Sequence, residues 1–261
     1  MNKIKNIFLL LLLAIVGMYS CDDDDRNGIV NPFADVNYEE LAITDNDSIV
    51  KFLKGHYYNA TLDSIKLIES NETSIFDSGN MLIMDTVSNN NIDYKLYTFV
   101  INEGNPDSEK GFPSVIDSVF TNYTGVVLSR NTINTSPFDI GEQRWLTNTI
   151  PGWANGFTNF KGGKNITNNG PITYQNPGKG YIFIPSGLAY PSLNYQPNIS
   201  RPYDQILVFK VELLDLVEDT DHDNDGTPSI QEDANGDGDP TNDFSDNSRP
   251  NLPDYLNPNI T

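Results

Sequence analysis

Acidic side chains alternate with other residues near the C-terminal end of the chain. The spacing is D-x-D-x-D-G, then five other residues, then Glu, and it turns several oxygens toward one point. Gly226 permits the sharp turn that such a loop needs. The expected ligands are Asp221, Asp223, Asp225, Glu232 and the backbone carbonyl of Thr227. Hard oxygen ligands suit Ca²⁺, so the sequence predicts a structural calcium site here, with a solvated acidic tail as the alternative.

A second acidic unit follows the first without a break. Its polar and glycine residues are Asp233, Asn235, Asp237, Gly238, Asp239 and Asp243. The twelfth position is Phe244, which offers no side-chain oxygen, so a standard loop is not expected and calcium binding by this unit stays open. The pattern lacks the two amphipathic helices that flank the loop of an EF-hand. Pro228 also disfavours a regular EF-hand. The tail resembles the helix-free calcium repeats of thrombospondin type 3 and similar extracellular modules.

Four apolar and aromatic motifs lie in the middle of the chain. They read Y-T-G from Tyr123, I-P-G-W from Ile150, I-P-S-G-L-A-Y from Ile184 and L-V-F-K-V-E-L from Leu207. In this order they resemble motifs of the FKBP-type peptidyl-prolyl cis–trans isomerases, over about residues 94–215. The resemblance implies a curved antiparallel sheet packed on one short helix.

The resemblance also implies an apolar pocket for a proline ring. The residues at the matching positions are Tyr123, Phe138, Ile150, Trp153, Tyr190 and Phe209. Trp153 would form the floor, while the Ile150 N–H and the Tyr190 hydroxyl would hold carbonyl groups of the peptide. The implied clients are proline-containing polypeptides, and the implied chemistry is non-covalent and needs no catalytic cofactor.

Three features depart from the family pattern. Ile133-Asn134 replaces the usual Phe-Asp pair, and Pro191 replaces a glycine, which fixes φ and removes a donor. An insertion rich in Asn and Gly occupies 161–179. Two alternatives therefore stay open beside the isomerase: a catalytically weak module that binds Pro-containing segments or partner proteins, and a mainly structural surface protein.

The N-terminal end has the pattern of a bacterial export signal. Lys3 and Lys5 precede an apolar run at 7–16, which is too short to span a bilayer. Residues 18–21 resemble a lipobox, so we expect a signal peptide at 1–20 and lipid on Cys21, the only cysteine. The acidic run 22–25 resembles a surface-export signal. These features predict an outer membrane lipoprotein at the cell surface, with a periplasm-facing protein as the alternative.

Composition excludes several other classes of protein. The formal net charge is −20, which disfavours nucleic acid as a partner, because phosphate binding needs a basic surface. From Glu218 onward the chain holds 12 acidic residues and one basic residue, Arg249. A single cysteine allows neither an intramolecular disulfide nor a Cys-based zinc site. With only His56 and His222 available, a Ser–His hydrolase has little support.

The elements that must position these residues indicate an α+β domain. Apolar residues at helical spacing predict a helix at 46–57, with His56 packed in a core rather than binding a ligand. β-forming runs predict strands at 94–101, 115–128, 180–184 and 205–214, with one short helix at 150–160. The expected layout is a lipidated tether at 21–44, an N-terminal helical extension at 45–93, the FKBP-like domain at 94–216 and an irregular acidic calcium-binding tail at 217–261.

Overall fold

The computed structural model describes residues 36–107, 109–129, 132–134, 136–147, 149–197 and 199–260. The predicted signal peptide, Cys21 and the acidic run 22–25 lie outside the described residues. Among the helices of the described part, none has the length and apolar character needed to cross a membrane.

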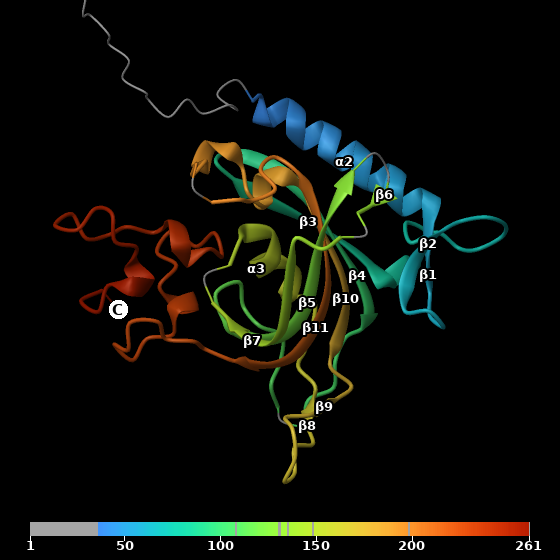
Figure 1. Ribbon diagram of the computed structural model, residues 1–261. Helices are drawn as coiled ribbons and strands as arrows, with labels where there is room; N and C mark the ends of the chain where they lie inside the picture. Colours follow the sequence, from blue (N-terminus) through green and yellow to red (C-terminus); the bar gives the residue numbers. More distant parts are fainter. Residues whose placement is uncertain are drawn as a thin grey trace, which may run out of the picture. The chain divides into compact units, whose positions relative to one another are not determined.

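One antiparallel sheet of seven strands dominates the described chain (Figure 1). Its strand order is β3-β4-β10-β11-β5-β6, and β7 also pairs with β5. The bounds are β3 Leu82–Asn89, β4 Ile92–Asn102, β5 Ser118–Ser129, β6 Thr132–Ile133, β7 Asp139–Leu146, β10 Gly178–Ile184 and β11 Ile206–Val217. The four predicted strands are thus confirmed as β4, β5, β10 and β11. The fold class is α+β, as predicted.

Both faces of this sheet are buried at its centre. Along β11, Phe209 and Val211 belong to one apolar cluster, whereas Ile206 and Val208 belong to a second. Alternate side chains of a strand point to opposite faces, so one strand feeds both cores. We call the face of Phe209 the inner face and the face of Val208 the outer face.

The short helix α3, Pro151–Phe157, packs on the inner face (Figure 1). Pro151 occupies the first turn, where its missing N–H costs no hydrogen bond. Gly152 and Gly156 face the sheet. A Cβ at Gly152 would lie only 2.2 Å from Ile184 Cγ2, and a Cβ at Gly156 would lie 2.6 Å from Ile182 Cγ2. The two glycines therefore let the helix backbone approach the sheet more closely than other residues would allow.

The longer helix α2, Tyr38–Gly55, covers the outer face (Figure 1). It begins earlier than the predicted start at 46, because the Asn37 side chain accepts a hydrogen bond from the Glu40 N–H and caps it there. Ile49, Phe52 and Leu53 are buried in the outer cluster. Part of the predicted tether is therefore helical.

His56 is a packed core residue, as predicted, although it begins β1 and lies outside the helix. Its ring stacks on Phe52 at 3.9 Å between centroids, and its Nδ1 lies 2.8 Å from the Phe52 carbonyl oxygen. Strand β1, His56–Asn59, pairs with β2, Ser64–Leu67. At the turn between them, Asp63 receives hydrogen bonds of 2.7 Å from both Lys179 and Lys210, which join the hairpin to the sheet.

Smaller elements complete the described chain. The predicted insertion forms the hairpin of β8, Lys164–Asn165, and β9, Tyr174–Gln175. Its Tyr174 contacts Phe120 and Asp215. The 3₁₀ turns are η1 Gly79–Met81, η2 Ser186–Leu188, η3 Ser192–Asn194, η4 Ser229–Gln231, η5 Pro240–Asn242 and η6 Asp254–Leu256.

The close approach of α3 generates a stability prediction. Gly152→Ala should lower the free energy of unfolding by about 1–3 kcal/mol, because the new methyl group would overlap the Ile184 side chain. Urea denaturation followed by fluorescence measures this. The matched control is Gly55→Ala at the end of α2, where no atom lies within 4 Å of the new methyl group. Equal stabilities of the two variants would contradict the predicted overlap.

Candidate functional site

An aromatic cluster lies between α3 and the inner face of the sheet. The ring centroid of Trp153 is 4.7 Å from that of Phe209 and 4.9 Å from that of Tyr123. The Phe138 ring meets Phe209 at 5.7 Å. These pairs meet at interplanar angles of 80–84°, an edge-to-face arrangement that aromatic rings favour. The structure thus brings together four of the six predicted pocket residues in direct ring contacts.

Two glycines make room for these rings on the sheet. A Cβ at Gly125 would lie 2.5 Å from the Phe209 ring and 3.0 Å from the Phe138 ring. A Cβ at Gly141 would lie 2.1 Å from the ring of Tyr123. Gly125 is the glycine of the Y-T-G motif, so its role is to let two aromatic rings cross the strand. Gly141 was not singled out from the sequence, since only its pairing opposite Tyr123 reveals its role.

The other two predicted residues, Ile150 and Tyr190, pack against the same inner cluster as Trp153. Ile150 is the residue before α3, and its carbonyl accepts hydrogen bonds from the N–H groups of Trp153 and Ala154. No described residue accepts a hydrogen bond from the Ile150 N–H or bonds to the Tyr190 hydroxyl. Burial raises the pKa of Tyr190, so this hydroxyl stays protonated at neutral pH. Within the described residues, both groups are therefore donors without an acceptor.

The floor of the cluster is covered. Trp153 and Phe209 are 3% and 2% exposed, whereas Phe138 at the rim is 36% exposed. The Trp153 Nε1–H is also buried, and within the described part of the chain it has no hydrogen-bond partner. A proline ring would therefore reach Trp153 only if the residues at the rim move apart.

The departures from the family pattern have distinct positions. Ile133 lies in β6 and packs in the outer cluster, so it contributes nothing to the inner aromatic group. Pro191 is buried before η3 at φ −64°, a value that its ring favours. The insertion hairpin meets Gln143, Phe120 and Asp215 rather than the aromatic cluster.

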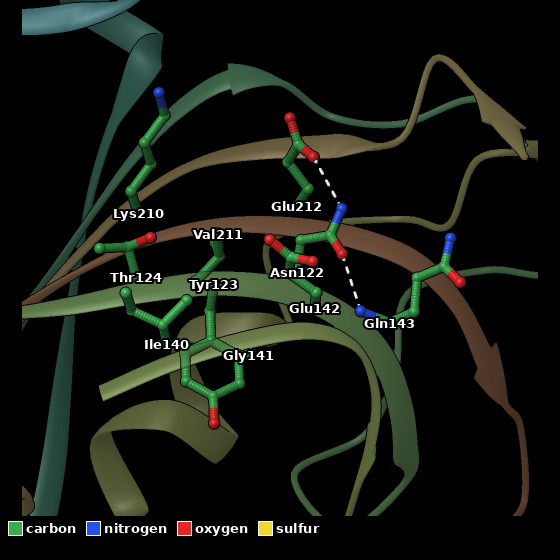
Figure 2. Close-up of a pocket in the computed structure, with 10 residues that line it drawn as sticks. All are labelled: Asn122, Tyr123, Thr124, Ile140, Gly141, Glu142, Gln143, Lys210, Val211 and Glu212. Atoms are coloured by element: carbon green, nitrogen blue, oxygen red, sulfur yellow. Dashed lines mark hydrogen bonds between the residues drawn. The ribbon is translucent and has the colours of Figure 1, made fainter.

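An open hollow of the described surface lies on the other side of β5 and β11 from Trp153. It has a volume of about 660 Å³ and is lined by residues of β5, β7 and β11, including Asn122, Lys210 and Glu212 (Figure 2). The Asn122 amide donates a hydrogen bond to Glu212 and accepts one from the Gln143 N–H, so these polar residues of the lining bond to one another. In Figure 2 the Tyr123 ring points toward the short helix and away from Lys210. This open, polar depression lacks the apolar walls of a ligand pocket.

Helix α2 holds the loop that carries Tyr190, a role that sequence reasoning missed. The Tyr38 hydroxyl lies 2.8 Å from Ser192 Oγ and 3.1 Å from Asp204 Oδ1, and it accepts a 3.0 Å hydrogen bond from the Leu193 N–H. Deeper along the helix, the buried Asp45 accepts hydrogen bonds from the backbone N–H and hydroxyl of Ser186. Burial raises the pKa of Asp45, and these hydrogen bonds oppose the rise.

The first acidic loop of the tail brings three of the predicted ligands close together. Oxygens of Asp221, Asp223 and Asp225 lie within 4.8 Å of one another. Glu232 follows η4 and is 5% exposed, and neither of its carboxylate oxygens has a partner in the described part. Burial, followed by the nearby Asp charges, raises the pKa of Glu232 to about 7. His222 lies within hydrogen-bond distance of Thr147 Oγ1 and Ser229 Oγ through its two ring nitrogens.

The comparisons with known proteins give structural similarities only. No protein-family model matches the chain, and no curated protein matches it significantly. A peptidyl-prolyl cis-trans isomerase from Pseudomonas syringae pv. tomato is similar at a TM-score of 0.38 and 16% identity, covering 70% of this chain and 98% of that one. FkpA from Escherichia coli is similar at a TM-score of 0.36 and 23% identity, covering 69% of this chain and 63% of that one. A multi-domain immunophilin from Arabidopsis thaliana is similar at a TM-score of 0.33 and 17% identity, covering 46% of this chain and 42% of that one. At these TM-scores the similarity alone defines neither fold nor activity.

The contact between α2 and the loop at 190–205 generates a second prediction. Tyr38→Phe should speed amide hydrogen exchange in this loop by about tenfold, because each lost hydrogen bond stabilises by about 1 kcal/mol. Tyr57→Phe on β1 is the matched control, since its hydroxyl only accepts a bond from the nearby Asn59. Unchanged exchange in Tyr38→Phe would show that α2 does not hold the loop.

Proposed function

We propose that the chain is an FKBP-type peptidyl-prolyl cis–trans isomerase that acts on exported or surface proteins. The observation that carries the proposal is the edge-to-face contact of Trp153 with Phe209 and Tyr123 on the inner face. These are residues of three separate motifs, far apart in sequence, and they form one apolar centre. Phe138 supplies the exposed rim.

The chemistry requires no nucleophile. Rotation about an X–Pro bond has an activation energy of about 20 kcal/mol, because the amide must lose its resonance. A twisted amide is less polar than a planar one, so an apolar centre at Trp153 would stabilise it selectively. The Ile150 N–H and the Tyr190 hydroxyl would hold the flanking carbonyl groups while the proline rotates.

A binding module without useful turnover is the second candidate function. It is favoured by the 3% exposure of Trp153, which leaves little apolar floor for a proline ring before the rim opens. The position of Ile133 on the outer face also favours it, because the inner site then lacks the wall that the family places there. This module would grip Pro-containing segments or partner proteins through Phe138 and Tyr190.

We further propose that the first acidic loop binds a structural Ca²⁺ ion. Asp223 Oδ2, Asp225 Oδ2 and both oxygens of Glu232 are buried without a partner in the described part, and buried carboxylates need a cation or a donor. The donor set fits a hard cation: carboxylates of Asp221, Asp223, Asp225 and Glu232 with the Thr227 carbonyl. The ion would offset the repulsion among these charges and order the tail.

The export pattern supports a location for this activity. We propose that lipid on Cys21 anchors the chain in the outer membrane, exposed at the cell surface. The short apolar run at 7–16, followed by the lipobox-like residues 18–21 with the only cysteine, supports this proposal.

The isomerase prediction uses the full chain without its predicted signal peptide. The chain should accelerate isomerisation of a proline peptide weakly, with a preference for an apolar residue before proline. Phe138→Ala should lower kcat/KM by about tenfold, since partial loss of an apolar wall costs about 1–2 kcal/mol. The matched control is Phe76→Ala, because Phe76 is also 36% exposed and lies beside Lys54 of α2. Peptide binding without acceleration would replace the isomerase with the binding module.

The calcium prediction is measured by calorimetry and by protease resistance of the tail. Calcium should bind at about 10⁻⁴–10⁻³ M, the range of extracellular modules, and should protect the tail. Glu232→Gln should weaken binding to the first loop by about tenfold or more, because one charged ligand is lost. Glu39→Gln, an exposed acid of α2, serves as the control. A flat titration of the unaltered chain at millimolar calcium would reject this site.

A further inference from the structure

The second acidic unit has the same backbone-to-side-chain hydrogen bonds as the first. In the first loop the N–H groups of Asn224 and Gly226 bond to the two carboxylate oxygens of Asp221. In the second, the N–H groups of Gly236 and Gly238 bond in the same way to Asp233. All four donors have positive φ.

The equivalence extends to the next two side chains of each loop. The Asp225 N–H bonds to Asp223 Oδ1, and the Thr227 N–H bonds to Asp225 Oδ1. The counterparts are bonds from the Asp237 N–H to Asn235 Oδ1 and from the Asp239 N–H to Asp237 Oδ1. The two loops are therefore the same structure, displaced by a constant step in sequence.

The two loops differ in the position of the buried acidic residue that follows each loop and supplies its last carboxylate. Each loop leads into a 3₁₀ turn, and Glu232 is the residue after the first turn, η4. The residue after the second turn, η5, is Asp243. The second unit is one residue shorter between loop and turn, so its closing acid precedes Phe244. Side-chain spacing alone therefore placed Phe244 where the structure places Asp243.

Asp243 has the environment of a ligand. It is 5% exposed, its Oδ2 is buried without a partner in the described part, and its Oδ1 accepts a hydrogen bond from the Asn235 N–H of the loop. The carboxylate thus faces the loop. Asp237 Oδ2 accepts from the Asn242 amide, but a carboxylate oxygen keeps a second lone pair for a cation.

A third unit places a basic side chain between its first and its closing residue. Asp246 begins it, and Asn257 follows its turn, η6. The Arg249 guanidinium lies between them, with Nε 2.8 Å from Asp246 Oδ2 and Nη2 bonded to Asn257 Oδ1. Arg249 is the only basic residue of the tail. The cation position of this unit is filled by a side chain of the protein itself.

We propose that the tail is a row of three cation loops: residues 233–243 form a second calcium site closed by Asp243, and Arg249 takes the place of the metal ion in the third. This inference rests on the proposed calcium binding of the first loop. It goes further in two ways. It assigns Asp243 as the closing ligand of the second loop, and it assigns the Arg249 guanidinium as the cation of the third loop, which remains when calcium is removed.

The test of the second site is a titration of the full chain, without its predicted signal peptide, with calcium chloride. ¹⁵N-glycine labelling makes Gly226 report the first loop and Gly238 the second. Both signals should respond at millimolar calcium. Asp243→Asn should weaken the response of Gly238 by about tenfold or more and leave that of Gly226 unchanged, which also shows that the tail still folds.

The outcomes separate this inference from the proposed function. A response of Gly226 without one of Gly238 would overturn the second site and leave the first intact. Silence of both signals would reject calcium binding by either loop. An unchanged Gly238 response in Asp243→Asn would reject Asp243 as the closing ligand.

The third loop is tested by amide hydrogen exchange of 246–257 in the presence of a chelator. The unaltered chain should keep its protection there, and Arg249→Ala should lose it, because the paired oxygens of Asp246 and Asn257 are left without their cation. Arg144→Ala, an exposed arginine on β7, should behave as the unaltered chain. Equal protection in Arg249→Ala, or loss of protection in the unaltered chain, would overturn the role of Arg249.

Discussion

The close approach of α3 to the sheet is the contact on which the candidate site depends. Gly152 and Gly156 remove the side chains that would otherwise hold the helix away from Ile184 and Ile182. Only at this separation does Trp153 meet the edge of Phe209. Interiors are packed without spare volume, so a helix displaced by one methyl group would separate Trp153 from Phe209 and Tyr123.

The sheet carries a second core on its other face, and that core reaches the site indirectly. Helix α2 buries the outer face through Ile49, Phe52 and Leu53, and the same helix bonds through Tyr38 and Asp45 to the loop that carries Tyr190. The loop that carries Tyr190 is thus tied to an element on the opposite side of the sheet.

The tail solves a different physical problem, the accumulation of negative charge. Carboxylates that are buried without donors repel one another unless a cation lies between them. Arg249 meets this need within one unit, and in the other two units both oxygens of Glu232 and one oxygen of Asp243 have no partner among the described residues. The tail also contacts the residue after β7, because His222 Nε2 lies 2.6 Å from Thr147 Oγ1.

The sequence by itself determined the central strands, the short helix, the aromatic positions and the first acidic loop, because each depends on local spacing. Tertiary structure decided the remaining points. Whether Ile133 lines the site depends on which face of the sheet β6 joins, and the burial of Trp153 depends on how closely α3 approaches. The role of Asp243 depends on a turn that shortens the second unit by one residue. Such features arise from contacts between distant residues, which local patterns do not encode.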